Sequence, residues 1–143
     1  MEFKYSDGGR AKAGYRGKAS GDCFVRAVAI ALDLPYDHVY SIVAERCNKT
    51  NPRKKKRRNH PAKGIYREFA DKILEEFGWE WVPTVMPGGR NYPKLRACDL
   101  PDGPIVARVS RHFCAVIDGT VYDDHDPTRG GKRLVYGYYR RRP

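Results

Sequence analysis

The chain has 143 residues, a net charge of +11 and a hydrophobic fraction of 41%. We expect one domain over residues 1–143, a length that buries roughly two thirds of the unfolded surface. No apolar run reaches the ~18 residues of a membrane-spanning helix, and the polar start Met1–Lys4 is not typical of a signal peptide. These features predict a cytoplasmic protein with no membrane contact, and its widely spaced cysteines are expected to be free thiols.

The first predicted element is a helix over Cys23–Leu32, in which only Arg26 interrupts an apolar surface. Such a helix is normally buried. Ser20 or Asp22 can cap its start, so Cys23 falls in the first turn. The positive end of the helix dipole favours a thiolate there, although a free cysteine is also a common core residue.

Two further helices are predicted, over Tyr36–Cys47 and Lys63–Phe77. In both, apolar residues recur at helical spacing, and Gly78 ends the second. Residues 1–20, before the first helix, are rich in Gly, Lys and Ser and are expected to be extended.

A basic segment, Lys49–Lys63, separates the second and third helices as a loop insertion and carries eight Lys or Arg and no acid. A charge run of this kind is usually a solvated loop. Its functional interpretation is contact with a polyanion, either nucleic acid or an acidic protein. The candidate binding residues are Arg53, Lys54, Lys55, Lys56, Arg57 and Arg58.

Strand patterns follow the helices, and residues 85–102 between them are expected to form a loop. The predicted strands are Trp79–Val82, Ile105–Ser110, His112–Ile117, Thr120–Asp124 and Arg133–Tyr139. Helices first and antiparallel strands later predict an α+β domain.

The dipeptide Asp118-Gly119 between two apolar runs predicts a tight hairpin, because a type I′ turn needs positive φ at both positions. This turn pairs Ile117 with Thr120, Cys114 with Asp123 and His112 with His125. Asp123 is then a diagonal neighbour of His112, within reach of a ring nitrogen. The opposite face of the first strand is apolar as well, which indicates a central strand.

The order of these residues resembles a known family. Gly21-Asp22-Cys23, followed by His112 and by Asp126-Pro127 after the hairpin, resembles the bacteriocin-processing cysteine peptidases and their papain-like relatives. The chain ends also look like uncharacterised bacteriophage proteins. The resemblance implies a papain-like fold, in which a central Cys-bearing helix packs on a C-terminal antiparallel sheet, and a peptide or protein substrate.

In such an enzyme Cys23 is the nucleophile and His112 is the general base and then the acid. Two residues compete to orient His112, namely Asp123 by strand geometry and Asp126 by motif. The related peptidases place a Gln, which lends an amide to the oxyanion hole, where this chain has Gly17, and the chain contains no Gln. The Cys23 N–H remains as a donor, with Ser20, Lys18 or Arg16 as candidate second donors.

The sequence leaves four functions open. The first is a cysteine hydrolase that cleaves a peptide or other amide and needs no cofactor. The second is a non-catalytic module of the same fold that binds nucleic acid or an acidic partner. The third is a thiol acyltransferase or transglutaminase-like enzyme with the same triad. The fourth is a metal site made by His112, His125, Asp123 and Cys114.

Overall fold

The computed structural model describes residues 1–17, 21–50, 59–84 and 92–143. Within these residues the chain forms an α+β fold of three α-helices, one short 3₁₀ helix and a six-stranded sheet. The helices are α1 (Cys23–Ala31), α2 (Tyr36–Thr50), α3 (Arg67–Glu76) and η1 (Ala97–Asp99). The strands are β1 (Glu2–Tyr5), β2 (Trp79–Pro83), β3 (Pro104–Val109), β4 (His112–Ile117), β5 (Thr120–Asp123) and β6 (Gly137–Arg141).

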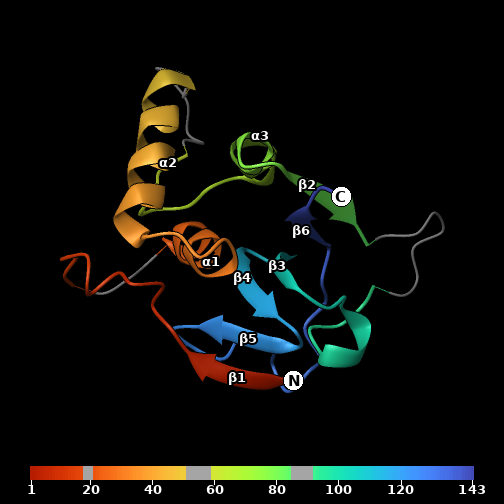
Figure 1. Cartoon of the computed structure of the whole chain (residues 1–143). Helices are drawn as coiled ribbons and strands as arrows, with labels where there is room; N and C mark the ends of the chain where they lie inside the picture. Colours follow the sequence, from red (N-terminus) through yellow and green to blue (C-terminus); the bar gives the residue numbers. More distant parts are fainter. Residues whose placement is uncertain (18–20, 51–58, 85–91) are drawn as a thin grey trace.

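The strands lie in the order β1-β5-β4-β3-β6-β2. All neighbours run antiparallel except β1, which pairs in parallel with β5. The prediction of a purely antiparallel, C-terminal sheet is therefore wrong, because the start of the chain supplies an edge strand. Figure 1 shows that α1, α2 and α3 lie on the same side of the sheet, with α1 directly over β4.

Strand β4 is covered on both faces, as the sequence predicts. On the helix side the Phe24 ring of α1 meets the Phe113 ring edge-on, with centroids 5.1 Å apart. On the other side Cys114 and Val116 pack in a second apolar cluster with Val121 of β5. The alternation of side chains along a strand thus divides β4 between two cores.

The predicted turn between β4 and β5 is confirmed. Asp118 and Gly119 have φ values of 48° and 78°, and Ile117 pairs with Thr120. The ladder ends at Ala115–Tyr122, so the expected Cys114–Asp123 and His112–His125 pairs do not form. The chain bends at 124–125, immediately after β5, and this bend ends the pairing.

Several predicted boundaries shift. Helix α3 begins at Arg67 instead of Lys63, because residues 60–64 form a turn closed by a His60–Gly64 bridge. Strand β6 begins at Gly137 instead of Arg133, because Val135 N–H donates to the Pro93 carbonyl at 2.9 Å. No helix in the described part of the chain is long and apolar enough to span a membrane.

Candidate active site

Cys23 is the first residue of α1, and Asp22 occupies the N-cap position. The Asp22 carboxylate does not cap the helix, because it accepts hydrogen bonds from the Tyr36 hydroxyl at 2.7 Å and from the Arg26 guanidinium. The prediction of a side-chain cap by Asp22 is therefore wrong, and Ser20 lies outside the described residues. No described residue accepts the Cys23 N–H, so this donor is free to bind an anion.

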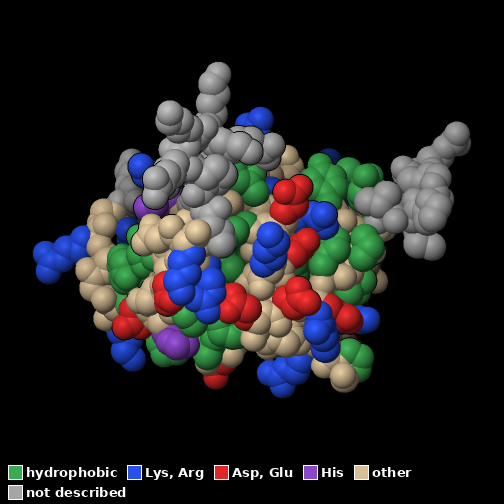
Figure 2. Space-filling view, turned by 90° about the horizontal axis from the view of Figure 1, so that it is seen from above, with side chains coloured by type: hydrophobic (Ala, Val, Ile, Leu, Met, Phe, Trp, Pro, Cys, Tyr) green, Lys and Arg blue, Asp and Glu red, His purple; other side chains and the backbone are tan. Residues whose placement is uncertain are grey.

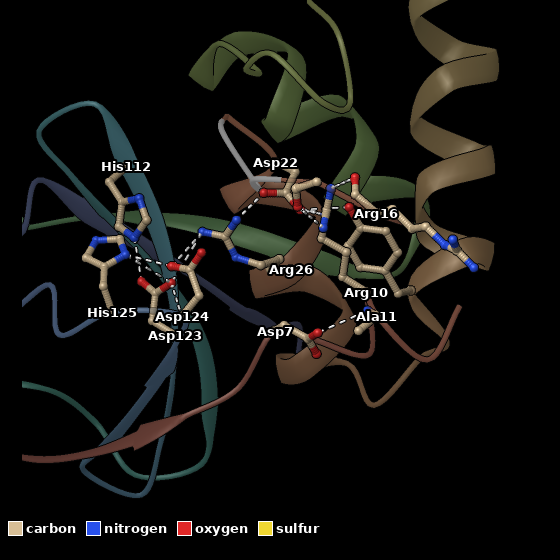
Figure 3. Close-up of polar contacts among 12 residues, drawn as sticks. Asp7, Arg10, Ala11, Arg16, Asp22, Arg26, His112, Asp123, Asp124 and His125 are labelled. Atoms are coloured by element: carbon tan, nitrogen blue, oxygen red, sulfur yellow. Dashed lines mark hydrogen bonds and ion pairs between the residues drawn. The ribbon is translucent and has the colours of Figure 1, made fainter. Parts of the chain in front are cut away.

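His112, at the start of β4, bonds to both Asp123 and Cys23. Its Nε2 lies 2.5 Å from Asp123 Oδ2 at the end of β5, as Figure 3 shows. The remaining ring nitrogen faces the sulfur, and a hydrogen bond joins the Cys23 and His112 side chains. The predicted contact between Asp123 and a ring nitrogen of His112 is confirmed. Three elements, α1, β4 and β5, thus bring a thiol, an imidazole and a carboxylate together.

The three groups shift each other's pKa values. Burial alone would lower the pKa of His112, but hydrogen bonds and charge from Asp123 and Cys23 raise it to about 9. Burial would raise the pKa of Cys23, but hydrogen bonds from His112 and the Phe113 backbone, with the charges of His112 and Arg26, lower it. Near neutral pH this arrangement favours a thiolate beside an imidazolium.

The other buried cysteines differ from Cys23. Burial raises the pKa of Cys47 to about 11 and also raises that of Cys114. All four cysteines are free thiols, as predicted, and Cys98 is exposed. Activation therefore distinguishes Cys23 from the two buried thiols.

Asp126, the orienting residue suggested by the motif, has a different role. Its Oδ1 accepts hydrogen bonds from the Thr128 N–H at 2.9 Å and the Thr128 hydroxyl at 2.7 Å, which closes a turn after β5. No contact in the described part of the chain joins Asp126 to His112. The structure thus brings Asp123 to His112 and leaves Asp126 in its own turn.

Arg26 is the site residue that the sequence analysis missed. It is buried and bridges the start of α1 to the end of β5 (Figure 3). Its guanidinium pairs with Asp22, with Asp123 at 3.4 Å and with Asp124 at 3.3 Å. The available signal was a lone charge in an apolar helix, four residues after Asp22. Arg26 therefore holds the carboxylate of Asp123 from the side opposite His112.

His125 completes a cluster that matches part of the predicted metal set. The donor atoms of His112, Asp123 and His125 lie within 4.8 Å of one another. Cys114 is not part of this cluster. Two ligands on one tetrahedral zinc ion stand roughly 3.3 Å apart, given metal–ligand bonds of ~2.0 Å. The 2.5 Å separation of His112 and Asp123 is instead a hydrogen-bond distance.

A pocket of about 400 Å³ opens beside Cys23. It is lined by the start of α1, by residues 63–66 and by the β3–β4 hairpin. Gly21 has φ +88°, and a Cβ on it would lie 2.8 Å from the Lys63 carbonyl carbon. Only glycine allows this close approach, which holds residues 63–66 against the mouth of the pocket.

The remaining predicted residues do not contribute to this geometry. Lys18, Ser20 and Arg53–Arg58 lie outside the described residues. Arg16 is exposed, and its carbonyl accepts a hydrogen bond from Arg10 Nη2 at 3.1 Å.

Comparison of this chain with protein-family models, with curated proteins and with solved structures finds no match in any of the three.

Proposed function

We propose that this protein is a cysteine hydrolase that cleaves a peptide or another amide with the triad Cys23, His112 and Asp123. The observation that carries the proposal is the chain of two side-chain hydrogen bonds, from Asp123 to His112 at 2.5 Å and from His112 to Cys23. The position of Cys23 at a helix start beside an open pocket supports the same assignment.

The chemistry requires only these side chains and water. The Cys23 thiolate attacks the amide carbonyl, and the His112 imidazolium gives its proton to the leaving amine as the carbon–nitrogen bond breaks. A thioester to Cys23 remains. His112, now neutral, takes a proton from water, whose oxygen attacks the thioester, and the acid product leaves with the thiolate restored. Asp123 holds the ring in position throughout.

The free Cys23 N–H is the first oxyanion donor in this proposal. It points outward from the first turn of α1, where the helix dipole adds to its effect. A second donor in the part played by Gln in the related peptidases is not needed for attack, but its absence slows the reaction by ~10²–10³. We therefore expect modest turnover.

The architecture is compatible with the papain-like arrangement that the sequence resemblance implies. A Cys-bearing helix packs on a sheet whose strands β4 and β5 carry the histidine and the acid. The papain-like fold, the bacteriophage origin and the cytoplasmic location are parts of this proposal and are supported by that resemblance alone.

The experiment is cleavage of a peptide library, with products identified by mass spectrometry. We expect wild-type protein to cleave some members and to accumulate a thioester adduct on Cys23. Cys23→Ala should abolish cleavage, whereas Cys98→Ala, which removes an exposed thiol, should have no effect.

Alkylation by iodoacetamide near neutral pH is the substrate-independent test. Cys23 should react well before Cys98, because only Cys23 has an imidazolium that stabilises its thiolate. Equal rates at the two cysteines, together with no cleavage that depends on Cys23, would contradict the proposal. Tight nucleic-acid binding that persists in such an inactive protein would favour the non-catalytic module instead.

A further inference from the structure

The pocket beside Cys23 is basic. Lys63, Arg108 and Arg111 line it, and no acidic residue in the described part of the chain does. All seventeen Asp and Glu residues lie within the described ranges, so this statement covers every acid of the chain. The face over α2 and α3 is different, because acidic and basic side chains alternate across it in Figure 2. The sign of charge at the pocket is thus a local feature.

Arg108, on β3, is the most constrained of the three cations. It is half-buried, and its guanidinium lies 4.4 Å from the centre of the Phe113 ring. Among the described residues, no carboxylate forms an ion pair or hydrogen bond with Arg108. Buried Arg26 contrasts with it, because three aspartates surround that guanidinium.

An unpaired guanidinium in this position is costly, because burial removes water from the charge. That burial lowers the pKa of Arg108, whereas the nearby Cys23 thiolate raises it. Stacking on Phe113 offsets part of the cost and fixes the plane of the fork. A carboxylate is the ligand whose two oxygens match such a fork.

We propose that Arg108 is the specificity residue of this site and that it binds a carboxylate of the substrate close to the scissile amide. Arg111 and Lys63, which are exposed on the same pocket, add attraction for the same anion. This inference rests on the proposed function, because it names the substrate class for the same thiol.

Two alkylating agents of nearly equal size test the inference without a known substrate. Iodoacetate carries a carboxylate and iodoacetamide a neutral amide, and with either reagent the sulfur–carbon bond forms as iodide leaves. We expect the ratio of the iodoacetate rate to the iodoacetamide rate to be about tenfold higher at Cys23 than at exposed Cys98, as a charge-assisted contact predicts.

Substitution of Arg108 separates its effect from that of the nearby imidazolium. In Arg108→Gln the rate ratio at Cys23 should fall by about tenfold, towards the value at Cys98. Arg140→Gln is the matched control, because Arg140 pairs with Glu80 on β2 and does not line the pocket. It should leave the ratio unchanged. A ratio that stays high in Arg108→Gln would assign the attraction to His112 and overturn the proposal.

The wild-type measurement stands by itself if Arg108→Gln fails to fold. Equal ratios at Cys23 and Cys98 in wild-type protein overturn the inference, whatever the variant does. Fast iodoacetamide reaction at Cys23 in the same experiment leaves the proposed nucleophile intact, so the two failures are distinguishable.

Peptide substrates identify the source of the carboxylate. In library cleavage, members with Glu next to the cut site should be preferred over their Gln counterparts by about tenfold. Preference for a free over an amidated C-terminus would assign the carboxylate to the peptide end. Equal cleavage of all four forms would overturn the inference.

Discussion

Removal of the Asp123 carboxylate should uncouple the His112 ring from the triad. Burial lowers the pKa of His112, yet its net value is about 9 instead of the ordinary 6.5, a difference that corresponds to about 3 kcal/mol in favour of the imidazolium. The hydrogen bond from Asp123 is the largest contribution that raises it. Asp123→Ala should therefore lower the His112 pKa by at least about one pH unit.

The assay is a pH titration of the histidine ring signals by NMR. The chain has four histidines, and the His112 signal is identified by its loss in His112→Gln. The midpoint should lie near 9 in wild-type protein and fall in Asp123→Ala. Asp126→Ala is the matched control, since that carboxylate bonds only to Thr128 among the described residues, and its midpoint should stay near 9.

The change should also appear at the sulfur. The charge of His112 lowers the pKa of Cys23, so an earlier loss of that charge moves the alkylation midpoint of Cys23 to higher pH. A wild-type His112 midpoint near 6.5, or an unchanged midpoint in Asp123→Ala, would refute the reasoning. An effect of Asp126→Ala alone would favour the motif-based assignment.

Two further predictions concern the basic segment and the packing of the sheet. If Lys49–Lys63 binds a polyanion, neutralising Arg53–Arg58 should flatten the salt dependence of binding by roughly one log–log unit for each phosphate that the variant no longer neutralises, measured by fluorescence titration with DNA; salt-independent binding in wild-type protein would reduce the segment to a solvated loop. Gly137→Ala should lower the free energy of unfolding by about 1–3 kcal/mol in urea titrations, because the added methyl overlaps the Trp81 ring. Combination with Trp81→Leu should restore part of that stability, and a stable single variant would contradict the packing argument.

Local rules in the sequence were sufficient for much of the site. The Asp118-Gly119 turn sets the register of β4 and β5, because few other dipeptides adopt positive φ at both positions. That register, with the alternation of side chains, predicted the contact of Asp123 with His112. The apolar run after Cys23 likewise predicted a buried helix with the thiol in its first turn. Each of these conclusions depends only on residues close together in the chain.

The tertiary structure alone decided how distant segments meet. Strand β1 pairs with β5, and β6 enters the sheet between β3 and β2, and no local pattern specifies either neighbour. The same holds for Arg26, whose charge is accommodated only because α1 crosses the end of β5 and three aspartates meet there. Arg108 became informative only in the folded chain, since the sequence contains seventeen acids but does not say which of them lie near a given cation. Pairing between remote residues depends on packing over the whole fold, and that is the physical reason it could not be read from the order of residues.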